Sequence, residues 1–164
     1  MEVDTELGPI QNKMQFDKVC DLIADIQASG QRILTGGNVE PGKGYFVPVT
    51  LVDNPPENSR VVVEEAFGPV LPLLKWHRED DVVRRANDSP YGLGASVWGK
   101  DLKKAEAIAS RLEAGTVWIN EIHVLSPDYA FGGHKQSGMG VEHSLQGLAE
   151  YCNTQTLIQR PLLS

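Results

Sequence analysis

The chain has 164 residues, of which 41% are hydrophobic and 23% charged, and its formal net charge is −7. This composition is ordinary for a globular protein, and a chain of this length can bury a sizeable core. The negative charge and the scattered basic residues argue against a nucleic-acid partner, and no apolar run approaches the ~20 residues that a membrane-spanning helix requires.

Cysteine usage and the N-terminal residues indicate the compartment. The two cysteines, Cys20 and Cys152, lie far apart, and the first six residues show neither the basic nor the apolar region of a secretory leader. We therefore expect a reducing cytoplasm. Cys20 falls on the apolar side of a predicted helix and Cys152 just before a predicted strand, so we interpret both as small buried hydrophobes rather than nucleophiles.

The first predicted element is an amphipathic helix over residues 11–29, followed by Gly30 at a position typical of a left-handed cap. Strands are predicted over 32–35 and 45–52, where Pro48 requires an edge or a bulge because it donates no ladder hydrogen bond. A short helical turn is expected after Ser59, and residues 70–76 resemble a buried strand.

The next elements alternate between helix and strand. Helices are predicted over 79–87 and 101–112, each followed by a strand, at 93–98 and 116–119. This alternation is typical of an α/β fold with a partly parallel sheet and right-handed crossover helices. We expect the three tryptophans, which lie in or at the ends of predicted strands, to be core residues: Trp76, Trp98 and Trp118.

The texture changes after Asn120. Residues 121–130 read as irregular, 131–140 are rich in glycine, and a short helix is predicted over 143–151. Residues 154–158 alternate like a strand that has no sequential partner, which suggests pairing with the edge of another chain. We therefore predict a homo-oligomer that assembles through this C-terminal strand.

The glycine-rich stretch does not match the phosphate-binding templates. It lacks the third glycine of a dinucleotide-binding loop and the Gly-Lys-Ser/Thr order of a P-loop. No spacing among the four histidines and two cysteines matches a zinc site, so no metal is expected. A Cys-His hydrolase remains formally possible.

Three runs in this order resemble the C-terminal part of the NAD(P)-dependent aldehyde dehydrogenases: residues 64–70 (EEAFGPV), 115–120 (GTVWIN) and 130–138 (AFGGHKQSG). The resemblance extends from Leu7 to about Ile158. It implies the fold of the closing part of that catalytic domain over residues 1–142, and a C-terminal helix with an oligomerisation strand over 143–164. Ala130 and Val141 depart from the family's usual proline and arginine, which weakens any subfamily assignment.

The resemblance also implies cofactor contacts. In this family the residue matching Glu65 hydrogen-bonds the nicotinamide ribose and the residue matching Phe67 lies near the nicotinamide ring. A carboxylate suits a ribose diol because it only accepts hydrogen bonds. Gln15 and Lys18, three apart on one helix face, match residues that approach the same ribose. The alternatives are a solvated Glu65, a core position for Phe67 and a solvated helix face for Gln15 and Lys18.

On the substrate side, the resemblance places Phe131 and Leu125 at the aldehyde tunnel and makes the 131–140 loop structural. The family's nucleophilic cysteine, general-base glutamate and Rossmann segment precede the matched region, so we predict that this chain alone neither oxidises aldehydes nor binds NAD or NADP appreciably. The choices are the C-terminal portion of an aldehyde dehydrogenase or a standalone noncatalytic module for assembly. The residues that choose between NAD and NADP, and the aldehyde itself, cannot be read from this sequence.

Overall fold

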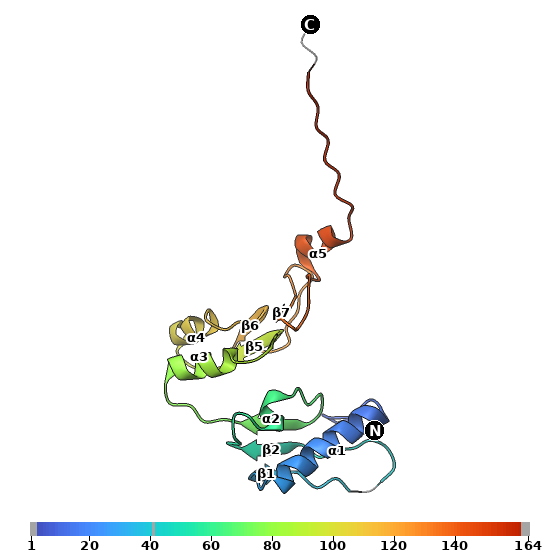
Figure 1. Cartoon of the computed structure of the whole chain (residues 1–164), viewed down its shortest axis with the longest axis vertical. Coiled ribbons are helices and arrows are strands. Elements are labelled where there is room, and N and C mark those ends of the chain that lie inside the picture. Colours follow the sequence, from blue (N-terminus) through green and yellow to red (C-terminus); the bar gives the residue numbers. More distant parts are fainter. Residues whose placement is uncertain (1–2, 41, 162–164) are drawn as a thin grey trace. The chain divides into compact units, whose positions relative to one another are not determined.

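The computed structural model describes residues 3–40 and 42–161, which divide between Trp76 and His77 into two compact units (Figure 1). The predicted domain boundary after residue 142 stays a prediction. No helix in the described part of the chain combines the length and the apolar character needed to cross a bilayer.

The first unit is a three-stranded sheet packed against helices. The sheet order is β1-β2-β3, in which β1 pairs antiparallel with β2, and β2 pairs parallel with β3 through the crossover that contains α2. The helix α1 begins after Asn12, whose side chain accepts a hydrogen bond from the Gln15 amide. The elements are α1 (Lys13–Ala28), β1 (Ile33–Thr35), β2 (Thr50–Asp53), α2 (Arg60–Val63) and β3 (Val70–Leu73).

The core of the first unit joins α1 to the sheet. The buried residues of α1 recur every three or four positions, as the apolar periodicity predicts, and they meet alternate residues of β2 and β3. This core burial confirms the predicted helix and its buried face. The core residues are Val19, Leu22, Ile23, Ile26, Val47, Val52, Val61 and Val70.

Two strand predictions in this unit were partly wrong. The strand predicted over 45–52 forms only from Thr50, since Pro48 offers no N–H and the Tyr45 carbonyl instead accepts from the Ile10 amide. The strand predicted over 70–76 ends at Leu73 and is not buried throughout: Val70 faces the core, whereas Leu71 and Leu73 are exposed. Because the residues are apolar on both faces of this strand, the sequence did not show that only one face packs in the core.

The second unit contains two small sheets. β5 pairs parallel with β6 through the crossover that contains α4, while β4 pairs antiparallel with β7. Figure 1 shows α3 and α4 beside the β5–β6 pair. The elements are α3 (Glu79–Asn87), β4 (Tyr91–Gly92), β5 (Gly94–Val97), α4 (Leu102–Ala109), β6 (Thr116–Ile119), β7 (His134–Lys135) and α5 (Ser144–Glu150).

The predicted α/β class is confirmed, and so is the parallel crossover through the helix predicted over 101–112, which joins β5 to β6. The helix predicted over 79–87 does not join a parallel pair, because β3 and β5 belong to different sheets, and the strands divide among three sheets in the part of the chain described. β4 and β7 were missed because two residues carry no periodicity. Residues 154–158 form no strand among the described residues, and Leu157 and Ile158 are 85% and 93% exposed. The core prediction was wrong for Trp98, which is 64% exposed, and for Trp76, which is also exposed.

Candidate functional site

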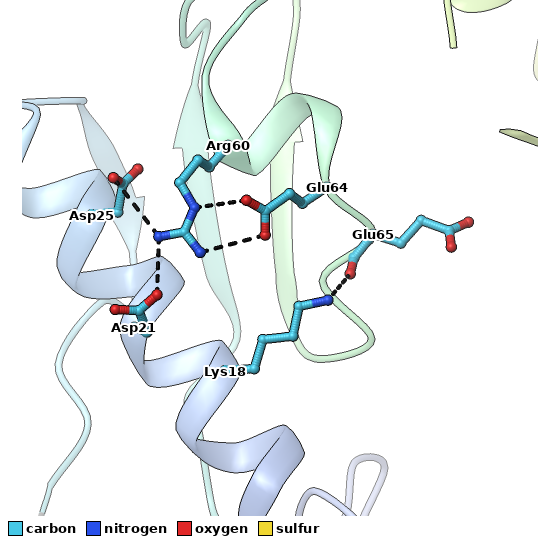
Figure 2. A network of polar contacts seen from close by, with 6 residues as sticks. All are labelled: Lys18, Asp21, Asp25, Arg60, Glu64 and Glu65. Carbon is cyan, nitrogen blue, oxygen red and sulfur yellow. Dashed lines mark hydrogen bonds and ion pairs between the residues drawn. The ribbon is translucent and has the colours of Figure 1, made fainter. Parts of the chain in front are cut away.

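The loop that follows α2 carries Glu65 and Phe67 and is fixed to α1 through its main chain. The side-chain amide of Gln15 donates a 2.7 Å hydrogen bond to the carbonyl oxygen of Ala66. The Lys18 ammonium donates one of 3.2 Å to the carbonyl oxygen of Glu65, which Figure 2 shows. Gln15 and Lys18 therefore share a helix face, as their spacing predicts, and that face is not merely solvated. In the described structure they hold the backbone of the loop.

The two predicted cofactor contacts on this loop keep their side chains free. Glu65 is exposed, its carboxylate points away from Lys18 in Figure 2, and it makes no hydrogen bond or ion pair with the described residues. Phe67 is 75% exposed, which excludes the alternative of a core side chain beneath the turn. The loop thus presents an acceptor and an aromatic ring from a restrained backbone.

The turn itself requires close packing. Phe67 has φ of +46°, a conformation that non-glycine residues adopt rarely and that marks a locally constrained backbone. The next residue, Gly68, lies against α1: a Cβ atom there would stand 2.6 Å from Val19 Cγ2. Any side chain at position 68 would push the loop away from the helix.

An open groove of about 610 Å³ lies beside this turn. Phe67 and Gln15 line it, together with Leu51 and Leu71 from the sheet, whereas Glu65 is not among its lining residues. Its wall is mainly apolar, which suits a flat ring or an aliphatic surface more than a free charge.

A neighbouring pair of charges lies on the other side of the loop. Arg60, on the first turn of α2, contacts Glu64 with Nε–Oε1 of 2.7 Å, and the Arg60 guanidinium holds the pKa of the Glu64 carboxyl below its ordinary value (Figure 2). The sequence pattern predicts no role for Arg60. The Arg60–Glu64 spacing of four could have indicated the pair, but nothing local indicates its contacts with α1.

The second unit contains a separate cavity of about 450 Å³ that includes both predicted tunnel residues, Phe131 and Leu125. One wall is the strand β6 and the other is the segment that follows it, residues 121–131. This segment is fixed by Trp118, whose indole N–H donates a 2.8 Å hydrogen bond to the Val124 carbonyl. Phe131 exchanges backbone hydrogen bonds of 2.9 and 2.7 Å with Glu142.

The glycine-rich loop has contacts that are structural. The Lys135 ammonium lies 2.6 Å from the Asn87 carbonyl oxygen, 3.0 Å from that of Ser89 and 2.8 Å from Glu113 Oε2. The two carbonyl oxygens accept hydrogen bonds from the ammonium, and Glu113 forms an ion pair with it. Ser137 accepts a 2.9 Å hydrogen bond from the Gly92 amide. Sequence analysis assigned neither residue a function, and the distant partners leave no local signal.

Glycine is also required where the chain approaches itself. A Cβ atom on Gly115 would overlap the carbonyl oxygen of Gly132, so the backbone before β6 touches the backbone of the glycine-rich loop. This contact explains why glycines precede the strand and begin the loop. It supports a packing role for the 131–140 segment.

The two cysteines differ in exposure. Cys20 is partly buried on α1, and burial raises the pKa of its thiol, which disfavours the nucleophilic thiolate. The burial predicted for Cys152 was wrong, because this side chain is exposed after α5. In the described ranges, no group of three or more histidine, cysteine, aspartate or glutamate side chains is arranged to hold a metal ion.

Comparison with known proteins gives a consistent family. The model of the aldehyde dehydrogenase family matches residues 1–157. Human Retinaldehyde dehydrogenase 3 is 42% identical over 156 residues, covering 95% of this chain and 30% of that protein, and human Aldehyde dehydrogenase 1A1 is 43% identical over 150 residues, covering 92% and 30%.

Solved structures agree. Betaine aldehyde dehydrogenase from Staphylococcus aureus, in complex with NAD+, has a TM-score of 0.85 at 37% identity and covers 92% of this chain and 30% of that one. An aldehyde dehydrogenase from Bacillus cereus has a TM-score of 0.87 at 39% identity, covering 92% and 31%. The chain therefore spans about a third of the length of the relatives that it matches.

Proposed function

Because the chain belongs to the aldehyde dehydrogenase family, we propose that it supplies part of the cofactor site and part of the aldehyde site for NAD(P)-dependent oxidation of an aldehyde to a carboxylic acid. The observation that carries the proposal is the loop after α2, in which Glu65 and Phe67 stay free while Gln15 and Lys18 hold the backbone.

The free groups fit a nicotinamide nucleoside. Both hydroxyls of a ribose donate hydrogen bonds, and the Glu65 carboxylate is an acceptor that no described residue uses. Phe67 presents an exposed ring next to a mainly apolar groove, where a flat heterocycle would be covered. The nicotinamide supplies the hydride acceptor when bound. The task of Glu65 is to orient the sugar, not to move a proton.

Gln15 and Lys18 have a task in addition to the contact with the nicotinamide ribose that the resemblance implies. Their side-chain nitrogens donate to main-chain carbonyls, so we assign them to restraining the loop. Lys18 also brings a positive charge to this end of α1, where a bound nucleotide would benefit from it.

On the aldehyde side, Phe131 and Leu125 form an apolar wall in the second unit. Such a wall excludes water and admits the carbon chain of an aldehyde while its reacting group faces other residues. Since burial disfavours the Cys20 thiolate and the chain spans about a third of the length of its relatives, we propose that the 164 residues alone do not catalyse the oxidation and bind NAD or NADP weakly.

The test joins the whole chain to the N-terminal two thirds of human Aldehyde dehydrogenase 1A1, replacing the segment that it matches. We expect the chimera to oxidise an aldehyde with NAD, and Glu65→Gln to raise the KM for NAD by roughly tenfold or more, because a hydrogen bond to a charged acceptor is lost. The control is Glu106→Gln, on an exposed position of α4. An inactive but folded chimera, or an unchanged KM in Glu65→Gln, would contradict the proposal.

A second function, assembly, is favoured by one observation. Residues 153–161 are outside any helix or strand, and Leu157 and Ile158 are almost fully exposed. We propose that residues 154–158 add a strand to another copy, in a cytoplasmic homo-oligomer, and that this holds whether or not the chain acts as part of an enzyme. Leu157→Lys combined with Ile158→Lys should lower the sedimenting mass. Unchanged sedimentation of the double variant would rule out the strand as the contact.

A further inference from the structure

Arg60, on α2, also contacts α1, the helix that holds the loop carrying Glu65 and Phe67. Its guanidinium lies 2.7 and 3.4 Å from the two carboxylate oxygens of Glu64 and 3.0 Å from Asp21 Oδ2, with Asp25 Oδ1 at 3.9 Å (Figure 2). One cation therefore faces three carboxylates, two from α1 and one from the end of α2.

The polar face of α1 contacts the segment formed by residues 60–66. Gln15, Lys18, Asp21 and Asp25 follow one another at spacings of three, three and four residues, so they lie on one side of the helix. Each of the four contacts a residue between positions 60 and 66. One face of α1 therefore holds the segment that leads to Glu65 through contacts along its length.

α2 needs such support because it is only one turn long. Four residues form a helix that is not stable by itself, and its N-cap residue Ser59 makes no capping hydrogen bond with its side chain. Val61 anchors one side of α2 in the core, while Arg60 anchors the side facing α1. The paired Glu64 is the residue directly before Glu65, so the direction in which the chain leaves α2 depends on this contact.

The Arg60 side chain is better suited to fixing the position of its partners than to raising the free energy of unfolding. Arg60 is 37% exposed, and ion pairs at such sites contribute little to the free energy of unfolding. The planar guanidinium, however, can contact Glu64 with two nitrogens and Asp21 with the third group in a fixed geometry. A lysine keeps the charge but loses this geometry.

We propose that Arg60 is a positioning residue for cofactor binding, which sets the direction of the Glu65 carboxylate by fixing α2 to α1. The inference rests on the proposed function, because it acts through the contact of Glu65 with the nicotinamide ribose. Arg60 itself touches no cofactor.

The experiment uses the chimera described above and a double-mutant cycle. Arg60→Lys should raise the KM for NAD by roughly five- to tenfold, less than the ~100-fold that a 1 Å misplacement can cause, with the KM for the aldehyde unchanged. In the Glu65→Gln background the same substitution should have almost no further effect, because the group that it positions is gone. Arg32→Lys, which alters the exposed Arg32–Asp53 pair in the same unit, is the matched control.

Asp21→Asn provides a second variant should Arg60→Lys fold poorly, since it leaves the Arg60–Glu64 pair in place and weakens only the link to α1. We expect it to raise the KM for NAD in the same direction. Equal effects of Arg60→Lys with and without Glu65, or no effect in either Arg60→Lys or Asp21→Asn, would overturn the positioning role. An unchanged KM in Glu65→Gln alone would instead overturn the proposed function, and this inference with it.

Discussion

The side-chain amide of Gln15 donates a 2.7 Å hydrogen bond to the main-chain carbonyl of Ala66, 51 residues later in the chain. This contact bridges the first turn of α1 and the loop between Glu65 and Phe67. It is part-buried, so its loss cannot be fully compensated by water.

We expect Gln15→Ala to destabilise the first unit by about 1 kcal/mol, the usual net contribution of one hydrogen bond. Gln15→Glu should cost more, because its carboxylate would face a carbonyl oxygen that can only accept. Urea unfolding measures both, followed by the fluorescence of Trp76 in a background where Trp98 and Trp118 are replaced by Phe. Equal stability of Gln15→Glu and the original chain would show that the Gln15–Ala66 contact is absent in solution.

Gly115→Ala tests the close approach of two backbones in the second unit. Because the added Cβ atom would overlap the Gly132 carbonyl oxygen, we expect destabilisation of about 3 kcal/mol or more, at the upper end of overpacking costs. Gly99→Ala is the control, since a Cβ atom there meets nothing within 4 Å and should have little effect. Similar unfolding midpoints for the two variants would contradict the predicted packing.

Lys135→Met removes the ammonium that holds two carbonyl oxygens and Glu113. We expect a loss of roughly 2–3 kcal/mol, because hydrogen bonds from a charged donor are lost and the Asn87 and Ser89 carbonyls lose that partner. Lys104→Met, which removes an exposed pair with Glu79, should cost less than ~1 kcal/mol. Thermal unfolding measures the loss of stability in both variants. Equal losses in Lys135→Met and Lys104→Met would show that Lys135 behaves as an ordinary surface charge.

The acid sensitivity of the first unit should depend on Arg60. The hydrogen bond from Arg60 lowers the pKa of Glu64 from its ordinary value of 4.5, with smaller contributions from the charges of Arg60 and Lys18 and against the opposing effects of burial and Asp21. A carboxyl whose folded-state pKa is lowered stabilises the fold above its unfolded-state pKa, and this stabilisation is lost as the pH falls through the folded-state value. In Arg60→Gln, an NMR titration should find the Glu64 pKa closer to 4.5. A Glu64 titration identical in both proteins would exclude the pair.

The aldehyde wall can be tested through substrate size. Leu125→Ala enlarges the cavity that Leu125 shares with Phe131, so the chimera should change its kcat/KM ratio between a long and a short aliphatic aldehyde by about tenfold. The KM for NAD should not change, because Leu125 does not line the groove beside Phe67. A change in the KM for NAD without a change in the aldehyde ratio would refute the assignment of Leu125.

Sequence periodicity predicted the elements whose stability is local. The apolar stripe of α1 and the crossover pair β5–β6 are present as expected, because their patterns follow directly from helix and strand geometry. The parallel pair β2–β3 was not predicted. The short pair β4–β7 could not be predicted: its two-residue strands are created by distant contacts such as Gly92 with Ser137.

The candidate site also has features that the sequence predicted and features that it did not. Resemblance in the motif was enough to identify Glu65 and Phe67 as candidates, but not that Gln15 and Lys18 contact main-chain oxygens rather than projecting freely. A carbonyl acceptor leaves no trace in the sequence, since every residue has one. For the same reason Arg60, whose partners on α1 are 35 and 39 residues away, was missed.

The use of main-chain acceptors by Gln15 and Lys18 has an evolutionary consequence. Any amino acid at positions 65 and 66 provides the same two carbonyl oxygens, so these restraints survive when the side chains at these two positions are exchanged. Natural drift or laboratory selection could therefore change the side chains of this turn without dismantling its scaffold, which makes the segment a convenient target for redesign.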